Sequence, residues 1–183
     1  MTPKTNLQFN ARVYQTVISA VGGVLWLWAV ARLHIDRSPR EQLILIGLMP
    51  VMVLAGLFTQ HFRMPFGLDL TQERLTFSLS DAIVLLVAYW YGVYPAIFVA
   101  GLEGFITSRR TVRRWSSNLF STGMMSLVAA ASALVIKAAL AFGTNAADAQ
   151  LPFYLAALVF FAASVTHNFV NMALLSTLLA MRH

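Results

Sequence analysis

Residues 78–110 constrain the fold more than any other stretch, because they hold two apolar runs joined by an uncharged Gly-Val-Tyr-Pro turn. Asp81 lies in the first run and Glu103 in the second. Runs of about 15 to 18 residues predict a short transmembrane helical hairpin, since a bilayer core of about 30 Å needs nearly that many residues at a rise of 1.5 Å each. A charge at the bilayer centre costs at least about 2.5 kcal/mol, so each carboxylate needs a partner or a wet cavity. Both are therefore candidate functional residues.

Composition points to the same environment. Hydrophobic residues make up 58% of the chain and charged residues 11%, whereas soluble domains have roughly 25% charged residues. The absence of cysteine excludes disulfides and thiolate metal sites. The net charge of +6 comes from basic residues in loops beside apolar runs, where lipid headgroups explain them. The predicted partner is the lipid bilayer, not nucleic acid.

The apolar runs predict an all-α integral membrane protein with six transmembrane helices. Residues 1–12 form an N-terminal segment, and 13–183 form a single transmembrane domain. The expected spans are about 13–33, 43–62, 78–92, 94–108, 118–142 and 152–181. Trp26 and Trp28 near the end of the first span are typical of an aromatic interface belt. The longest loop between spans, 63–77, has turn residues followed by imperfect alternation of apolar and polar side chains.

The basic residues predict how six spans would be oriented. Nine of them fall on the side that holds both chain ends and the loops 63–77 and 109–117: Lys4, Arg12, Arg63, Arg74, Arg109, Arg110, Arg113, Arg114 and Arg182. Three fall on the other side: Arg32, Arg37 and Arg40. Lys137 lies inside the fifth span, where its long side chain can reach the interface. The positive-inside rule then makes both termini cytoplasmic.

Polar side chains inside the spans are the candidate ligand-binding residues. On the last span, four of them fall within an arc of about 100° and form one polar stripe: Ser164, His167, Asn168 and Asn171. With Asp81 and Glu103 they would make a polar layer in the cytoplasmic half of the membrane. Two alternatives stay open, because Asp81 also suits the first turn of a helix and the stripe also suits hydrogen bonding between helices.

No catalytic signature accompanies this layer, since the chain contains no HExxH, GxSxG or phosphate-binding loop. Asp81, Glu103 and His167 are too scattered in sequence to indicate a metal site. We therefore expect a protein that is not an enzyme and that has no cofactor and no metal.

Small residues at four-residue spacing predict close packing of the fourth and fifth spans. The fourth span carries Ala96, Ala100 and Gly104, and the fifth carries Thr122, Ser126 and Ala130. Such stripes also suit a homodimer or a larger membrane complex. Between these spans lies a basic run that is expected to meet lipid headgroups: Arg109, Arg110, Arg113 and Arg114.

The order FSLSDAIVLL, YG.YPAIFVAGLEGF, a basic stretch, NLFSTGMMSLVAAASALV and HNFVNMALLSTLLAMR resembles the multi-span N-terminal sensor regions of bacterial signalling proteins. In that family these regions precede diguanylate cyclase, HD-type phosphohydrolase or histidine kinase modules. The resemblance covers roughly residues 43–182, and its most telling pieces are the 91–95 turn, Asn118 and Val170-Asn171. It adds Asn118 to the candidate ligand-binding residues. It implies a sensor in the bacterial cytoplasmic (inner) membrane that binds a small ligand and feeds a cytoplasmic signalling output.

The central hairpin is also similar to that of the substrate-binding components of energy-coupling-factor vitamin transporters. In that family the loop after the hairpin faces outward, which would place the basic run 108–114 outside, against the charge distribution. The sensor hypothesis is therefore preferred. A transporter component and a structural accessory subunit of a larger membrane complex remain the alternatives.

Overall fold

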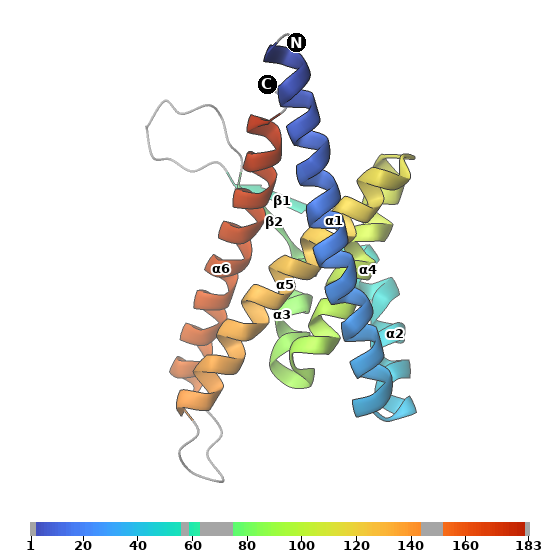
Figure 1. The fold of residues 1–183 in the computed structure, drawn as a ribbon. Helices are drawn as coiled ribbons and strands as arrows, with labels where there is room; N and C mark the ends of the chain where they lie inside the picture. The colour runs from blue at the N-terminus through green and yellow to red at the C-terminus, as the bar shows by residue number, and fades with distance from the viewer. Residues whose placement is uncertain (1–2, 56–58, 63–74, 144–151, 182–183) are drawn as a thin grey trace.

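In a computed structural model, which describes residues 3–55, 59–62, 75–143 and 152–181, the chain forms six helices and one small antiparallel sheet (Figure 1). The helices are α1 (Pro3–Asp36), α2 (Pro39–Ala55), α3 (Leu79–Tyr91), α4 (Val93–Thr111), α5 (Trp115–Gly143) and α6 (Phe153–Ala180). The strands are β1 (Thr59–Phe62) and β2 (Leu75–Ser78). The expected helical architecture is thus present, and each expected span overlaps one helix.

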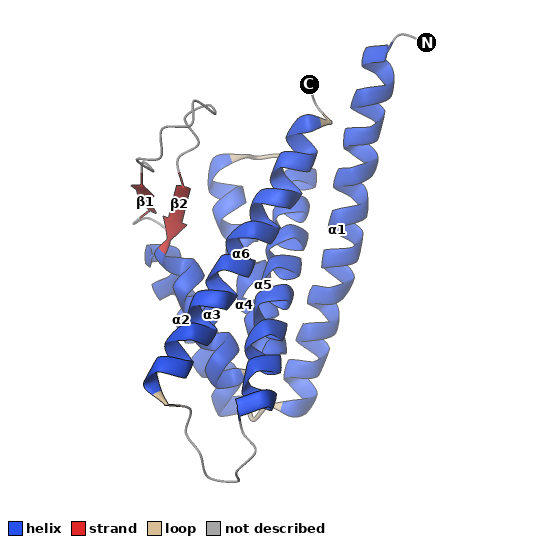
Figure 2. Cartoon of the chain, turned by 90° about the vertical axis from the view of Figure 1, so that its left-hand side faces the viewer, coloured by secondary structure: helices blue, strands red, loops and turns tan. Residues whose placement is uncertain are grey.

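Helix α5 is the centre of the bundle. It packs against α1, α3, α4 and α6, and its most extensive partner is α4. Figure 2 shows α1 standing on one side of the bundle and the β1–β2 hairpin on the other. The main apolar core draws residues from all six helices and includes the fully buried side chains of Leu45, Met52, Val99 and Ile136.

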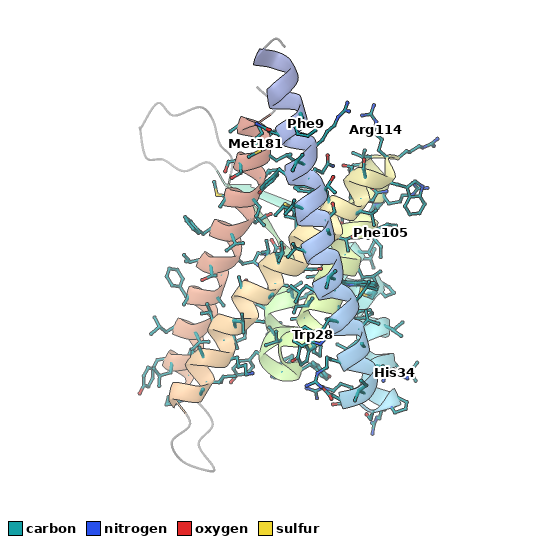
Figure 3. The ribbon with its side chains drawn as sticks, in the orientation of Figure 1. Phe9, Trp28, His34, Phe105, Arg114 and Met181 are labelled. Carbon is teal, nitrogen blue, oxygen red and sulfur yellow. The ribbon has the colours of Figure 1, made fainter. Side chains whose placement is uncertain are left out.

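The start of α1 and the end of α6 lie at the same end of the bundle (Figure 1). A small cluster of buried apolar residues, Ala11, Phe120 and Leu178, packs the beginnings of α1 and α5 against the end of α6. The Tyr14 hydroxyl donates a hydrogen bond of 2.9 Å to the Leu174 carbonyl, which also joins α1 to α6. Side chains at this end and at the opposite end are labelled in Figure 3, with Phe9 and Met181 at the first and Trp28 and His34 at the second.

Among the described residues, three helical segments are long and apolar enough to cross a membrane: Phe9–Asp36, Trp115–Ala141 and Phe153–Ala180. Their outward faces carry large apolar side chains, such as Val24 at 68% exposure on α1 and Phe169 at 72% on α6. Soluble monomers rarely expose contiguous apolar surface on this scale. The architecture is compatible with a helical membrane protein.

The second expected span differs from the structure. Helix α2 ends at Ala55, not at residue 62, and Thr59–Phe62 instead forms β1, which pairs with β2. The register sets Thr59 opposite Ser78 and Phe62 opposite Leu75. The tetrapeptide Thr59–Phe62 is more polar than α2, and pairing with β2 provides hydrogen bonds for its backbone groups. The expectation of a purely helical chain is therefore wrong at this point. The loop expected at 63–77 lies outside the described residues up to Arg74.

Helices also begin or end outside the bounds of the first and second expected spans. Residues from Pro3 onward belong to α1, which continues to Asp36, so most of the segment expected before the first span is helical. Of residues 34–42, which were expected to lie between the first two spans, only 37 and 38 are not part of a helix.

The turn between α3 and α4 depends on Gly92. Its φ of 90° lies in the region that side chains with a Cβ atom rarely adopt. Pro95 lies in the first turn of α4, where backbone N–H groups have no acceptor within the helix. Proline, which lacks this N–H, therefore costs no hydrogen bond there. This tight turn sets α3 and α4 side by side and aligns the start of α3 with the second half of α4.

Candidate functional site

Asp81 on α3 and His167 on α6 meet inside the bundle. The distance between His167 Nε2 and Asp81 Oδ1 is 3.4 Å, too long and too poorly aligned for a hydrogen bond in this geometry. The His167 side chain is 1% exposed, whereas that of Asp81 is 21% exposed. The contact joins α3 to α6, and its carboxylate side can be reached from outside the protein.

The other ring nitrogen of His167 faces α5. Ser132 Oγ lies 3.3 Å from His167 Nδ1 and donates its own hydrogen to the Val128 carbonyl at 2.8 Å. The donor in this contact depends on the tautomer of the imidazole. With Nδ1 protonated, the ring donates to Ser132 Oγ and turns the lone pair of Nε2 toward Asp81. With Nε2 protonated, the ring directs an N–H toward Asp81, and Nδ1 accepts from the Ser132 hydroxyl in place of the Val128 carbonyl.

Glu103 on α4 is buried, and both hydrogen bonds to it reach the same oxygen. Ser80 Oγ on α3 donates to Glu103 Oε1 at 3.1 Å, and Thr107 Oγ1 donates to it at 3.3 Å. Ser80 directly precedes Asp81 in the chain, so α3 contributes both a hydrogen-bond donor to Glu103 and the second carboxylate. Asp81 and His167 are also the ionisable groups whose charges act on Glu103. We call Ser80, Asp81, Glu103, Thr107, Ser132 and His167 the polar layer.

The polar layer connects α3, α4, α5 and α6. It contains three of the seven residues that the sequence nominated for ligand binding, Asp81, Glu103 and His167. Ser80, Thr107 and Ser132 were not nominated, because a hydroxyl in an apolar span gives no distinct pattern. The spacing of Thr107 from Glu103 was the available signal, since residues four positions apart on a helix are neighbours.

Asn118 takes part in a separate contact nearer the α4–α5 connection. It is fully buried at the start of α5, and Ser108 Oγ of α4 donates to its Oδ1 at 2.9 Å. Asn118 Nδ2 has no hydrogen-bond partner among the described residues. This asparagine therefore joins α4 to α5 through its oxygen.

The remaining nominated residues of α6 do not join the polar layer. Asn168 Nδ2 donates to the Ser164 carbonyl of its own helix at 2.9 Å, and both side chains are half-buried. Asn171 Oδ1 is buried without a hydrogen-bond partner in the described part of the chain. Of the four residues of the expected stripe, His167 is the one that is fully buried between helices.

Small residues permit close approach between α4 and α5. Ala96 and Ala100 are fully buried. A Cβ atom added to Gly104 would lie 2.8 Å from Met125 Cγ and 2.9 Å from the Ser121 carbonyl oxygen of α5. On α5, Ser126 is fully buried, whereas Thr122 and Ala130 are half-buried.

Two glycines that the sequence analysis did not single out lie where α1 and α5 approach each other closely. A Cβ atom added to Gly22 of α1 would lie 2.2 Å from the Gly123 carbonyl oxygen of α5. Nearby, Trp26 packs on Gly101 and donates from Nε1 to the Phe98 carbonyl at 3.0 Å. Trp26 therefore joins α1 to α4. Trp28, two residues on, is 51% exposed.

The basic run forms an exposed group at the end of the bundle that holds the start of α1 and the end of α6 (Figure 3). Its members are Arg109, Arg110, Arg113 and Arg114. The Arg109 guanidinium lies 4.8 Å from the ring centroid of Trp115 and donates to the Arg113 carbonyl at 3.1 Å. Exposed cations beside an exposed tryptophan are typical of a membrane interface.

Comparisons with known proteins give no further assignment. No protein-family model, no curated protein and no solved structure matches this chain. Within the described ranges, no three His, Asp or Glu side chains are grouped so that they could hold a metal ion. The chemistry of the polar layer is therefore that of two carboxylates, one imidazole and three hydroxyls.

Proposed function

We propose that this protein is a non-enzymatic, multi-pass membrane module that senses a small ligand through the polar layer and feeds a cytoplasmic signalling output in a bacterial inner membrane. The contact between Asp81 and His167 carries this proposal. It joins α3 to α6 and, through Ser132, to α5, so any species that binds there acts on three helices at once. A ligand can shift the equilibrium between two arrangements of the helices only when it binds the two with different affinity.

The charges of the polar layer favour a proton or a small cation as the ligand. Asp81 and Glu103 provide two carboxylates against the single imidazole of His167. Uncompensated charge at membrane depth is unfavourable, so proton or cation binding would change the stability of the contact.

We further propose six spans with both termini in the cytoplasm. The common placement of the start of α1, the end of α6 and the arginine-rich connection at one end supports it, because basic loops resist translocation. A reporter inserted near Thr111 and one fused after His183 should both give cytoplasmic signals. An external signal at Thr111 would contradict the orientation and favour the transporter component.

The ligand hypothesis is tested by the isosteric variants Asp81→Asn and Glu103→Gln, with Asp36→Asn at the opposite end as the matched control. Thermal unfolding in one nanodisc lipid is followed between pH 5 and 8, with methylammonium or with tetramethylammonium, which has no N–H group. The unfolding midpoint of the unaltered protein should depend on pH and rise with methylammonium. Asp81→Asn should stay folded and lose both responses, while Asp36→Asn should keep them.

A structural role predicts a different pattern. Removing one member of a buried pair typically costs about 3 to 5 kcal/mol, so Asp81→Asn would then lower the unfolding midpoint equally at every pH. If the unaltered protein also showed no response to pH or to methylammonium, the sensor hypothesis would be rejected. An accessory packing subunit would be the better description.

A further inference from the structure

A second site lies at the end of the bundle opposite to the start of α1 and the end of α6. A cavity of about 490 Å³ is bordered by the last turns of α1, the α3–α4 turn and the last turns of α5. Ligand pockets for small molecules usually measure about 300 to 1,000 Å³. None of the residues of the polar layer borders this cavity, so its function is independent of the function proposed above.

The walls of this cavity are positively charged. Arg32, Arg37 and Lys137 border it, against the single carboxylate of Asp36, which leaves a formal charge of +2 on its lining. Arg37 is already engaged by Glu41 Oε1 at 3.1 Å. Arg32 lies farther from its carboxylate partner, with Nε 3.4 Å from Asp36 Oδ2, so we assign a bound anion to Arg32 and Lys137.

Lys137 and Arg32 both have unused donors. The Lys137 ammonium makes no hydrogen bond or ion pair within the part of the chain that the structure describes. Arg32 Nε is buried and lacks a hydrogen-bond partner in the same described ranges, although Asp36 Oδ2 lies 3.4 Å away. A buried donor without an acceptor is unfavourable, and an oxyanion is the group that would satisfy it.

Aromatic side chains also border the cavity. Trp28 and Tyr94 meet edge to face with ring centroids 5.0 Å apart, and the Arg32 guanidinium lies 5.4 Å from the centroid of Tyr94. Tyr89 and Tyr91 also border the cavity. Aromatic faces of this kind bind flat apolar groups.

We infer that this cavity binds an amphipathic oxyanion, with its charged group at Lys137 and Arg32 and its apolar body against Trp28 and Tyr94. The anion is either a free aromatic carboxylate or the phosphate of a surrounding lipid. Both present an oxyanion next to an apolar group, and the experiment below separates them.

The test uses the full chain in nanodiscs of neutral phosphatidylcholine, with 2-naphthoate as the free anion and 2-naphthamide as its uncharged counterpart. Binding is followed by tryptophan fluorescence and by the unfolding midpoint. Naphthoate should bind and naphthamide should not, and added salt should weaken binding by screening. Lys137→Gln and Arg32→Gln should each weaken it about ten-fold, as expected for one charge-assisted hydrogen bond. Arg40→Gln, which removes a cation at this end that does not border the cavity, should leave binding unchanged.

A second arm identifies a lipid as the source. In nanodiscs containing phosphatidylglycerol, native mass spectrometry should detect a retained anionic lipid that is lost in Lys137→Gln and kept in Arg40→Gln, and that lipid should compete with naphthoate. Absence of this lipid together with naphthoate binding assigns the site to free carboxylates. The inference is overturned if naphthamide binds as well as naphthoate, or if neither naphthoate nor an anionic lipid depends on Lys137 and Arg32.

Discussion

Replacing Gly22 by alanine should destabilise the bundle, whereas the same replacement at Gly23 should stabilise it. At Gly22 the new Cβ would lie 2.2 Å from the Gly123 carbonyl oxygen, whereas ordinary contacts begin at 3.4 Å. The backbones of α1 and α5 must therefore separate by about 1.2 Å, the difference between these two distances. At Gly23 nothing lies within 4 Å of the new atom.

The expected magnitude follows from two opposing effects. Overpacking costs about 1 to 3 kcal/mol, and a gap of about 1 Å forfeits up to half of each dispersion contact along the interface. Alanine recovers about 1 kcal/mol through its higher helix propensity. The net loss for Gly22→Ala is about 2 kcal/mol, or about 4 to 8 °C in the unfolding midpoint for a chain of this size.

The measurement is thermal unfolding of both variants in the same nanodiscs, followed by tryptophan fluorescence. Gly23→Ala serves as the control, because it changes the same residue type one position away and should raise the midpoint by about 2 to 4 °C. If Gly22→Ala were as stable as Gly23→Ala, the close approach of α1 and α5 would not exist in the membrane.

Three further outcomes are expected. Gly104→Leu should destabilise the fold by about 1 to 3 kcal/mol in denaturant titrations, because its side chain must displace Met125 and the Ser121 carbonyl of α5. Trp26→Phe should cost about 0.5 to 1.5 kcal/mol by the same assay, since the Phe98 carbonyl loses its donor. Several contacts hold the pKa of Glu41 below its ordinary value of 4.5, and the backbone hydrogen bond from Ser38 contributes most to this lowering. The ionised carboxylate therefore stabilises the fold above that value and loses this effect as the pH falls through the folded-state pKa. Glu41→Gln should flatten the pH dependence of stability in this acidic range, and an unchanged pH profile would contradict the assignment.

The sequence predicted the helices well because apolar length and turn residues are local properties. The expected spans at 78–92 and 94–108 agree closely with α3 and α4, since Gly92 separates two apolar runs. The end of α2 was not predictable in the same way. Thr59–Phe62 begins four residues after the end of an apolar helix, and its pairing with Leu75–Ser78 depends on a partner 13 or more residues away.

The polar layer was predictable only in outline. A carboxylate in an apolar span needs a partner, and for this reason Asp81 and Glu103 could be chosen as candidates from the sequence. The identity of the partners depends on how helices pack, so Ser80 and Ser132 could not be chosen among the many hydroxyls of the chain. The cationic cavity was missed for a similar reason, because Lys137 and Arg32 are 105 residues apart and are brought together only by the packing of α1 against α5.

The narrow buried face of α6 has a consequence for how the bundle can move. Val159, Ala163 and His167 recur every four residues and so form a single line along the helix, while Phe161, Val165 and Phe169 are exposed around it. A helix held along one line can roll about its own axis with little change in buried area. His167 restricts this rotation, because its two ring nitrogens contact Asp81 of α3 and Ser132 of α5. We therefore expect the contacts of this one side chain to set the rotational position of α6.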